Sequence, residues 1–537
     1  MQQTRSFWGW GYNEYDIPAE IINSAKQSLQ FALGIKELEE IHPPKLEELQ
    51  LRKPRFVLPD ELKDICTDAT YDRASHSYGK SFRDIWRGLH GHFDNPPDYI
   101  AYPKDEAELS QIMKFATEND IALIPFGGGS SVVGGVEPTE SEAFRGVITL
   151  DMKHFNQILE IDHQSRCARI QAGIFGPALE AGLKPHGLTM RHYPQSFEFS
   201  TLGGWIATRS GGHFATLFTH IDEFVQGVRM LTPNGVWETR RLPGSGAGPS
   251  EERMICGSEG VFGVITEAWV RLQTIPKFKK TVTVHFDDFM TAAEACRQLA
   301  QSGLNPSNAR LISAFEALFN GLGSGKDHVL IVGFESHHHD VSEKMRVALE
   351  VCTKYGGTWK GTPKKAATDS KASKPTKSEK ANAWKASFLR APYMRDELMR
   401  FGLILETFET AVTWDQFEAF HAGVTKAAKD AVRKHCGAGL VTCRFTHLYT
   451  DGPAPYYTVM AKGKKGEEMA QWDAIKVAVS QAIIDFGGTI THHHAVGKDH
   501  APYYKQQQSE PFEQVLKGIK KVVDEKGVMN PGVLFGE

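Results

Sequence analysis

The stretch that decides the fold is IPFGGGSSVVGG, residues 124–135. It begins within the apolar run IALIPF, residues 121–126, which is typical of a buried strand. Three consecutive glycines allow successive backbone N–H groups to turn toward one point and approach an anion closely, and the two serines add hydroxyl donors. The stretch therefore predicts a cradle for a diphosphate group. A plain surface turn is the alternative.

The residues before this loop have the pattern of an α/β unit. The apolar run YIAYP, residues 99–103, is followed by an amphipathic stretch, Glu106–Glu118, and then by the run that ends in the glycine loop. A strand, a helix of about three turns and a second strand in this order predict the start of an α/β domain. Further strand-like runs follow at residues 147–151, 168–172, 225–231 and 264–272.

The pattern changes beyond Pro276, where the apolar runs VTVHF and HVLIVGF alternate with helical patterns at residues 290–302 and 341–355. We therefore predict an α+β chain with two domains. The expected parts are a partly helical N-terminal region (1–94) with a helix near residues 21–33, a first domain (95–275), a second domain (276–486) and a C-terminal segment that completes the active site (487–537).

Composition excludes several classes of protein. The 537 residues are 41% apolar and 23% charged with a net charge of −4, which predicts a soluble globular chain and gives no reason to expect nucleic acid as a partner. The seven cysteines are scattered and predict neither a disulfide framework nor a zinc ribbon. No secretory signal and no run of about 18 apolar residues is present, so we expect an intracellular protein and leave peripheral membrane contact open.

One segment is strongly basic. Residues 362–380, TPKKAATDSKASKPTKSEK, carry six Lys and hardly an apolar residue, which predicts a mobile loop. Contact with nucleic acid or anionic lipid is the more specific, functional alternative for the same run of charges.

Two familiar nucleotide motifs are not supported. Residues 321–327, GLGSGKD, resemble a phosphate-binding P-loop, but the spacing is short and Asp327 replaces the Ser or Thr that would bind magnesium. A G-x-G-x-x-G motif between a first strand and helix is also missing, which argues against a nicotinamide-binding Rossmann unit.

Two later segments share the style of the glycine loop. Residues 195–212, QSFEFSTLGGWIATRSGG, are dominated by small and hydroxyl residues, and residues 256–265, CGSEGVFGVI, repeat this style before a strand. Such composition suggests backbone packed against a flat ligand with polar groups at its edges.

These three segments, in this order, resemble flavoproteins of the vanillyl-alcohol oxidase or p-cresol methylhydroxylase type. The resemblance implies an FAD-binding domain followed by an α/β substrate (cap) domain. It implies noncovalent FAD, because Ser130 and Ser131 stand where some members attach the flavin through His or Cys. It assigns FAD contacts to Pro125, Phe126, Gly127, Gly128, Gly129, Ser130, Ser131, Gln195, Ser196, Phe197, Glu198, Phe199, Ser200, Thr201, Thr208, Arg209, Ser210, Gly211, Glu259, Gly260, Val261, Phe262, Gly263, Val264 and Ile265.

A closer resemblance is to the branch of this superfamily that makes the ether bond of ether lipids. It rests on GWGYN near the amino terminus, DRASHSYG (72–79), ETFETAVTWD (406–415), TCRFTHLY (442–449) and THHHAVGK (491–498). It implies an FAD-dependent homodimer with an apolar, membrane-facing entrance, which exchanges the acyl chain of acyl-dihydroxyacetone phosphate for a long-chain alcohol. The alternatives are an FAD-dependent dehydrogenase or oxidase of a 2-hydroxy acid or alcohol, and a flavin-binding protein without catalysis.

The same resemblance assigns roles in the reaction. Arg395 matches the substrate-binding arginine, and its fork of donors suits an anionic headgroup; a solvated ion pair with Asp396 is the alternative. Tyr456 matches the catalytic acid or base, although Tyr457 leaves the assignment uncertain by one residue. Arg209 is expected to buttress the flavin, with a buried structural salt bridge as the alternative.

The histidines His492, His493 and His494 are assigned to proton transfer and phosphate contact by the resemblance. Three adjacent histidines could also suggest a metal, but neighbouring residues of a strand point to opposite faces and no Cys or carboxylate completes the set, so we expect none. The second triplet, residues 337–339, matches no motif and is expected on the surface.

The chain ends in LFGE and has no long presequence, so we expect no peroxisomal targeting signal, and the compartment stays open between cytoplasm and peripheral membrane.

Overall fold

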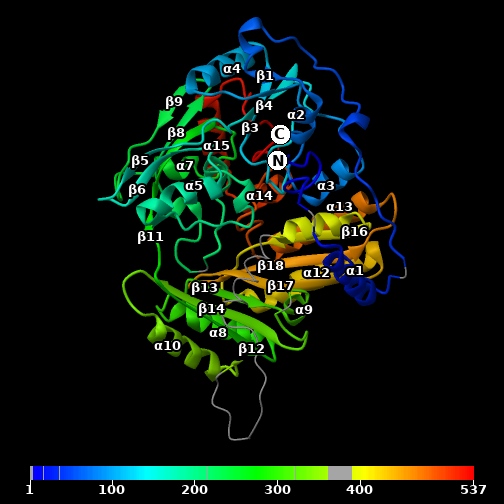
Figure 1. The fold of residues 1–537 in the computed structure, drawn as a ribbon, viewed down its shortest axis with the longest axis vertical. Coiled ribbons are helices and arrows are strands. Elements are labelled where there is room, and N and C mark those ends of the chain that lie inside the picture. Colours follow the sequence, from blue (N-terminus) through cyan, green and yellow to red (C-terminus); the bar gives the residue numbers. More distant parts are fainter. Residues whose placement is uncertain are drawn as a thin grey trace, which may run out of the picture.

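The computed structural model describes residues 4–15, 17–35, 37–214, 216–320, 322–360 and 390–536. The lysine-rich segment 362–380, for which a mobile loop is predicted, lies outside these residues. The described strands form four sheets, of four, five, two and seven strands. Figure 1 shows the four- and five-stranded sheets in the upper half of the molecule and the seven-stranded sheet in the lower half.

The four-stranded sheet carries the glycine loop at its edge. Its order is β1 (Cys66–Thr67), β2 (Tyr99–Ala101), β4 (Gly146–Asp151), β3 (Ile121–Phe126), and β2, β4 and β3 run parallel. Helix α4 (Glu106–Glu118) has the predicted bounds, because the Asp105 carboxylate caps the N–H groups of Ala107 and Glu108. Its apolar face packs on the sheet, so β3 is held where its carboxyl end leads into the loop.

The five-stranded sheet is antiparallel, in the order β5 (Ile158–Asp162), β6 (Cys167–Gln171), β10 (Val264–Arg271), β8 (Val225–Thr232), β9 (Gly235–Glu238). Its core contains the fully buried Trp205 of α6 (Leu202–Thr208). Residues 195–212 and 256–265, the second and third segments predicted to contact a flat ligand, lie around this core. The adjoining elements are α5 (Gly176–Leu183), α7 (Glu251–Ile255) and the two-stranded pair β7 (Leu188–Thr189) and β11 (Gln273–Thr274).

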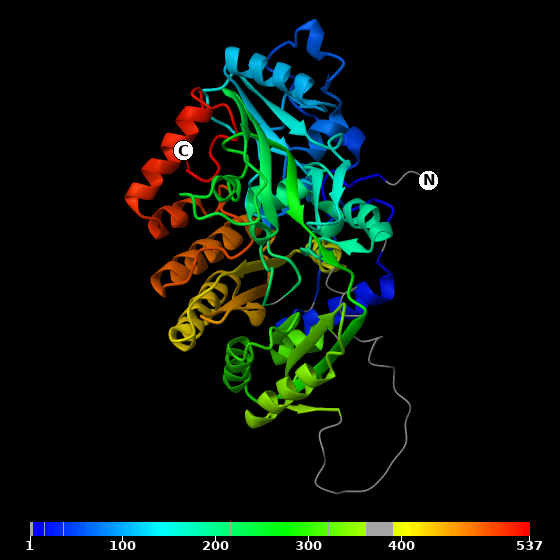
Figure 2. The same ribbon diagram turned by 90° about the vertical axis from the view of Figure 1, so that its left-hand side faces the viewer.

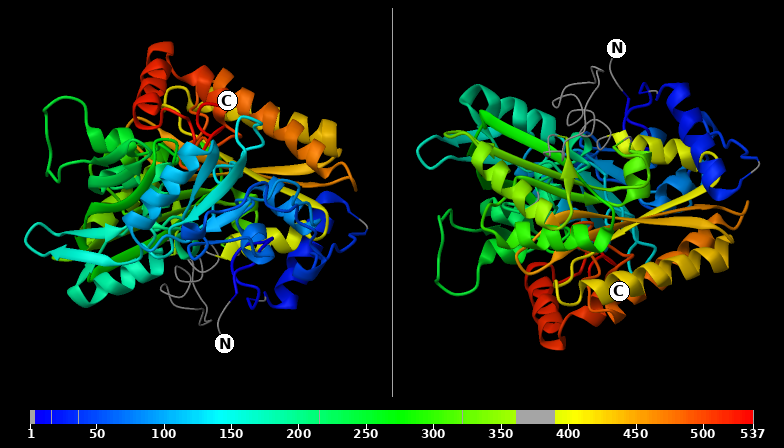
Figure 3. Two further views of the ribbon diagram at one scale, coloured as in Figure 1. Left: turned by 90° about the horizontal axis from the view of Figure 1, so that it is seen from above. Right: turned by 90° about the horizontal axis from the view of Figure 1, so that it is seen from below.

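The seven-stranded sheet is antiparallel throughout. Its order is β15 (Thr358–Trp359), β12 (Phe278–Phe286), β14 (His328–Ser336), β13 (Asn308–Ile312), β17 (Gly439–Leu448), β18 (Pro453–Lys462), β16 (Leu403–Glu409). One face packs on α8 (Phe289–Gln301), α10 (Ser342–Lys354), α12 (Phe417–Cys436) and α13 (Glu468–Asp485). Figures 2 and 3 show α12 and α13, in yellow and orange, side by side against this sheet. The opposite face is left for the cavity described below.

The two ends of the chain cross between the halves. Helix α1 (Ala19–Leu33) packs through Leu29 on the core of the seven-stranded sheet. At the other end, α15 (Glu510–Val523) contributes Leu516 to the core of the five-stranded sheet (Figure 2). Other helices are α2 (Thr70–Ser75), α3 (Phe82–Leu89), α9 (Ala314–Phe319), α14 (Ala501–Gln507), and the short 3-10 helices η1 (Leu46–Glu48), η2 (Asp60–Leu62), η3 (Lys184–His186), η4 (Phe197–Phe199) and η5 (Ile221–Glu223). Residues 390–399, which include Arg395, are also helical.

No helix among the described residues has both the length and the apolarity that a bilayer span requires.

Candidate active site

A large cavity lies between the glycine loop and the open face of the seven-stranded sheet. Its volume is about 1450 Å³, and residues of both halves of the chain line it. Pockets for one small ligand usually measure roughly 300–1,000 Å³, so this cavity has room for a cofactor together with a substrate.

The glycine loop lines one wall, and its close packing requires glycine. A Cβ at Gly128 would lie 1.8 Å from the carbonyl oxygen of Phe199, and one at Gly127 would lie 2.3 Å from Thr201 Oγ1. Gly129 has a φ of 64°, which an L side chain rarely adopts. The loop is therefore pressed against the second predicted segment, backbone to backbone.

The loop also offers unused donors. Among the hydrogen bonds within the described residues, none uses the backbone N–H groups of Gly128, Gly129, Ser130 or Ser131 as donors, and all four residues line the cavity. Consecutive unpaired N–H groups at the edge of a cavity are a cradle for an anion. The residues present therefore fit the diphosphate of FAD.

Most of the predicted FAD contacts line this cavity. They are Pro125, Phe126, Gly127, Gly128, Gly129, Ser130, Ser131, Gln195, Ser196, Ser200, Thr201, Thr208, Ser210, Gly211, Glu259, Gly260, Gly263, Val264 and Ile265. Glu259 is buried, and burial raises the pKa of its carboxyl to about 7. Its carboxylate accepts the N–H groups of Val496 and Gly497, both at 2.8 Å, and so ties the third segment to the loop that carries the histidine triplet.

Six predicted contacts lie away from the cavity. The side chains of Val261 and Phe262 are buried in the core of the five-stranded sheet. Arg209 ends α6 in the left-handed conformation and pairs with Asp222 at 3.0 Å, which favours the structural alternative given for this arginine, although its side chain is exposed rather than buried. The other three are Phe197, Glu198 and Phe199, in the 3-10 helix η4 that backs the cavity wall.

Arg395 lines the cavity and is held in one orientation. Its Nε and Nη2 donate to the Asp396 carboxylate at 3.0 and 2.8 Å, and its Nη1 donates to the Lys80 carbonyl at 2.8 Å. Asp396 is buried and also accepts the N–H of Trp10 at 2.6 Å, so the pair is not the solvated one considered above. A guanidinium has five N–H donors, which leaves two for an anionic ligand.

Tyr456 and its neighbour occupy different environments. Tyr456 lines the cavity, and the Arg444 guanidinium carbon lies 3.8 Å from its ring centroid. Burial raises the pKa of Tyr456, although Arg444 and a hydrogen bond with Thr407 oppose the rise. Tyr457 points to the helix-covered face, where its hydroxyl lies 3.0 Å from His421 Nδ1. The structure therefore places Tyr456, and not Tyr457, among the cavity residues.

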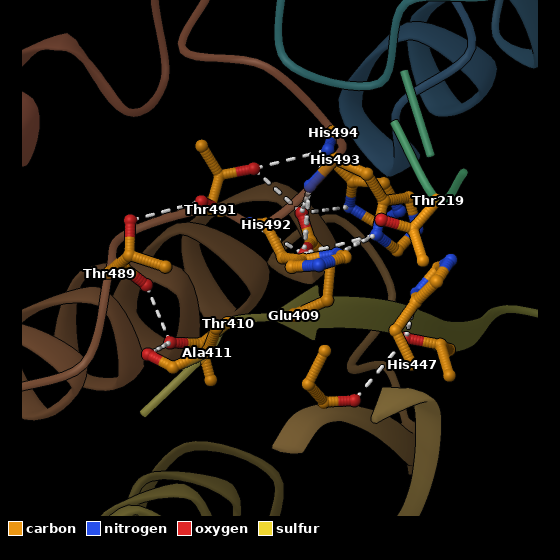
Figure 4. Close-up of polar contacts among 12 residues, drawn as sticks. Thr219, Glu409, Thr410, Ala411, His447, Thr489, Thr491, His492, His493 and His494 are labelled. Atoms are coloured by element: carbon orange, nitrogen blue, oxygen red, sulfur yellow. Dashed lines mark hydrogen bonds and ion pairs between the residues drawn. The ribbon is translucent and has the colours of Figure 1, made fainter. Parts of the chain in front are cut away.

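The histidine triplet is not part of a strand, so the argument from alternating strand faces was wrong. It lies in an irregular segment between α13 and α14, and the buried carboxylate of Glu409 lies beside it. His493 and His494 line the cavity, whereas His492 turns away and its Nε2 lies 2.6 Å from the Tyr449 hydroxyl. Figure 4 shows these side chains around the end of β16.

Burial keeps these imidazoles neutral. It lowers the pKa of His494 to about 3 and also lowers the pKa of His492 and His493. One nitrogen each of His447, His492 and His493 lies within 4.8 Å of the others, close enough to consider a metal. Both nitrogens of His447 already have oxygen partners, Gly212 O at 2.9 Å and Thr446 Oγ1 at 3.1 Å.

Sequence reasoning missed a second cationic wall. Arg310 of β13 and Arg444 of β17 both line the cavity, and Glu316 pairs with Arg444. Burial lowers the pKa of Arg310 to about 9. In TCRFTHLY, the polar residues Thr442, Arg444 and Thr446 alternate with Cys443 and Phe445, and that alternation was the available signal.

A glycine-loop cradle in an α/β half, facing an antiparallel sheet whose open side holds Arg, Tyr and His, defines an FAD-linked flavoprotein. Two family models match this chain: "FAD binding domain" over residues 97–240 and "FAD linked oxidases, C-terminal domain" over residues 275–534. FAD is the cofactor that these matches and the loop geometry assign.

Curated relatives narrow the class. The chain is 31% identical to alkyldihydroxyacetonephosphate synthase of Dictyostelium discoideum, over 93% of this chain and 83% of that protein. A solved alkyldihydroxyacetonephosphate synthase superimposes with a TM-score of 0.81 at 25% identity, covering 98% of both chains. The chain belongs to the alkyldihydroxyacetonephosphate synthase family. The structure of p-cresol methylhydroxylase with substrate bound shares the fold, with a TM-score of 0.66 at 15% identity over 97% of this chain and 98% of that one. These matches confirm the predicted α+β flavoprotein fold and the family resemblance.

Proposed function

We propose that the protein exchanges the acyl chain of acyl-dihydroxyacetone phosphate for a long-chain alcohol and so forms an ether bond. One observation carries the proposal: a single cavity brings Arg395, Tyr456, His493 and His494 to face the loop that fits the FAD diphosphate. The apolar side chains that also line this cavity, among them Leu318, Leu398 and Met460, suit long chains better than a small 2-hydroxy acid.

The balance of the exchange defines what the protein must do. The bond between the substrate carbon and the carboxylate oxygen breaks, the alcohol oxygen forms a bond to that carbon, and the alcohol proton is released. When bound, FAD supplies a ring nitrogen whose reactivity serves this exchange without net oxidation or reduction. The protein must hold the phosphate, move the proton and bury two long chains.

Each task has residues suited to it. Arg395 presents two remaining donors for the phosphate, and a charge-assisted hydrogen bond of this kind contributes about 1.5–3 kcal/mol. Tyr456, His493 and His494 are the proton-transfer candidates. The acyl and alkyl chains have an apolar lining to contact, which includes Leu29, Leu318, Phe319, Leu398, Leu405 and Met460.

We extend the proposal to assembly and location. The family resemblance favours an intracellular homodimer whose entrance faces a membrane. Helix α1 supports such an entrance, because Ile21 and Phe31 line the cavity and yet are 49% and 92% exposed. The boundaries 1–94, 95–275, 276–486 and 487–537 are proposed as domain limits, and the change of sheet near residue 275 supports one of them.

The test is a product assay with the purified holoprotein. Labelled hexadecanol and palmitoyl-dihydroxyacetone phosphate are expected to yield an ether-linked product, and lactate or glycolate should leave the oxidised flavin spectrum unchanged. Bleaching of the flavin by a 2-hydroxy acid, without ether formation, would replace this proposal with the oxidoreductase alternative.

A further inference from the structure

Glu409 is a buried carboxylate at the end of β16 around which the histidine segment is folded. Its side chain accepts the backbone N–H groups of His492, His493 and His494 at 2.6, 3.1 and 2.8 Å. It also accepts the Thr491 hydroxyl at 2.6 Å, and this hydroxyl in turn accepts the N–H of His494 at 3.1 Å. Figure 4 shows these bonds converging on one carboxylate.

We propose that Glu409 is a positioning residue for the exchange: it fixes the backbone of residues 491–494 and aims the rings of His493 and His494 into the cavity. The inference rests on the proposed function and deepens it. Successive N–H groups inside a strand ladder or a helix are bonded to other backbone atoms, whereas three that converge outside such an element need an acceptor at their centre. Glu409 supplies that acceptor from 83 residues earlier in the chain.

The contacts also set which ring nitrogen is available. His493 Nδ1 lies 3.3 Å from the Glu409 carboxylate and 2.9 Å from His492 Nδ1. Among the hydrogen bonds of the described residues, none uses His493 Nε2, and His493 lines the cavity. Nε2 is therefore the atom that is left to exchange a proton with a ligand.

The charge of Glu409 also acts on both rings. Burial lowers the pKa of His493 and His494, and the negative charge of Glu409 is the largest influence that opposes this effect. Other charged groups lower these pKa values: His220, Arg310 and Arg444 act on His493, and His493, Lys476 and His500 act on His494. Two further titratable side chains face the rings: Tyr456 lies 6.1 and 5.5 Å from His493 and His494, and His447 lies 5.9 Å from His493, between ring centroids. Glu409 thus offsets part of the loss of basicity that burial imposes on the two rings.

The same strand offers a matched control. Glu406 is also buried, but it lies on the opposite face of β16, where it accepts Trp472 Nε1 and pairs with Lys476 at 3.1 Å. Glu406→Gln removes a buried charge from the same strand and leaves the hydrogen bonds of the histidine segment in place. Because its partner Lys476 acts on His494, the comparison is made at His493. Glu409→Gln removes the charge at the segment, and Glu409→Asp keeps the charge but withdraws it by one methylene.

The experiment measures histidine reactivity in the holoprotein, separately from turnover. Diethyl pyrocarbonate modifies neutral imidazole, and peptide mass spectrometry follows His493 and His494 against pH, with the surface residues His338 and His339 as internal references. Glu409→Gln is expected to move the midpoint for His493 to lower pH. Glu409→Asp should place this midpoint between those of the unmodified protein and Glu409→Gln. Glu406→Gln should leave the midpoint for His493 unchanged.

Turnover provides a second readout. Glu409→Gln is expected to lower kcat by about ten- to a hundredfold with little change in KM, as part of the roughly 10²–10⁴-fold that acid–base catalysis supplies.

The pH midpoints of histidine modification decide the proposal. Unchanged midpoints in both Glu409 variants, or an equal shift in Glu406→Gln, would overturn it. If Glu409→Gln does not fold, the midpoint for His493 in Glu409→Asp decides the matter: a shift to lower pH supports the proposal, and an unchanged value overturns it. If the unmodified protein makes no ether while the Glu409 variants shift the midpoint, the proposed function fails and the positioning role stands.

Discussion

Tyr456 and Tyr457 are adjacent in the chain and lie on opposite faces of β18. Tyr456 lines the cavity beneath the Arg444 guanidinium, whereas the Tyr457 hydroxyl lies 3.0 Å from His421 Nδ1 in the helix-covered core. The same alternation runs along the strand, because Thr458 and Met460 also line the cavity while Val459 and Ala461 belong to the core. A period of two residues thus divides β18 into a chemical face and a packing face.

This division predicts different outcomes for two matched substitutions. Tyr456→Phe removes a proton-transfer group, so kcat for ether formation should fall by at least about a hundredfold while FAD is retained. Tyr457→Phe removes only a core hydrogen bond, which should lower the free energy of unfolding by about 1 kcal/mol and leave kcat nearly unchanged. The measurements are product assays and denaturant unfolding. Equal loss of activity in both variants would contradict the assignment.

Gly128→Ala tests the packing of the glycine loop. The added Cβ would lie 1.8 Å from the Phe199 carbonyl oxygen, so the loop must move and its N–H groups should no longer converge. We expect purified Gly128→Ala to contain much less FAD per protein by absorbance. Gly244→Ala, at an exposed position with no heavy atom within 4 Å, should keep the unmodified FAD content. Full FAD content in Gly128→Ala would show that the loop is not the cradle.

Arg395→Lys tests recognition of the phosphate. Lys has a single point charge and cannot keep the bonds to Asp396 and Lys80 while it contacts an anion. Loss of about 1.5–3 kcal/mol should lower kcat/KM for the phosphate-bearing substrate roughly ten- to a hundredfold. The control is Arg400→Lys in the same segment, where Arg400 pairs with Glu397 away from the cavity. Similar losses in both variants would argue against a substrate contact.

The buried histidines predict a loss of stability on mild acidification. Burial lowers the pKa of His192, His494 and His500 to about 3, whereas an unfolded histidine has a pKa of about 6.5. Below pH 6.5 the unfolded chain therefore binds protons that the folded protein does not bind. Each such histidine lowers the free energy of unfolding by about 1.4 kcal/mol per pH unit. Glu259, with its pKa raised to about 7, acts in the opposite direction, but it is one group against three.

The measurement is denaturant unfolding at several pH values between 7.5 and 5. We expect the free energy of unfolding to change little above pH 6.5 and to fall as the pH drops below it, and His500→Gln to reduce that slope. A flat or rising profile would mean that these imidazoles are not held neutral in the folded protein.

The sequence was a good guide wherever the signals were local. The bounds of α4 follow from its Asp105 cap and its apolar periodicity, and the glycine loop follows directly from a recognisable strand. The histidine segment could not be derived in this way, because its backbone is organised by Glu409, which is distant in the chain. The ion pair of Arg209 with Asp222 is likewise a contact that only the fold identifies, and the Arg209 side chain is not among those that line the cavity.

Isotope labelling of the alcohol oxygen tests the central claim, acyl-for-alkyl exchange, most directly. Hexadecanol carrying ¹⁸O is incubated with the holoprotein and palmitoyl-dihydroxyacetone phosphate, and both products are analysed by mass spectrometry. The exchange predicts ¹⁸O in the ether product, none in the released palmitate, one palmitate per ether formed, and a flavin that stays oxidised after turnover. Release of palmitate without an ether, or ¹⁸O recovered in the palmitate, would contradict it.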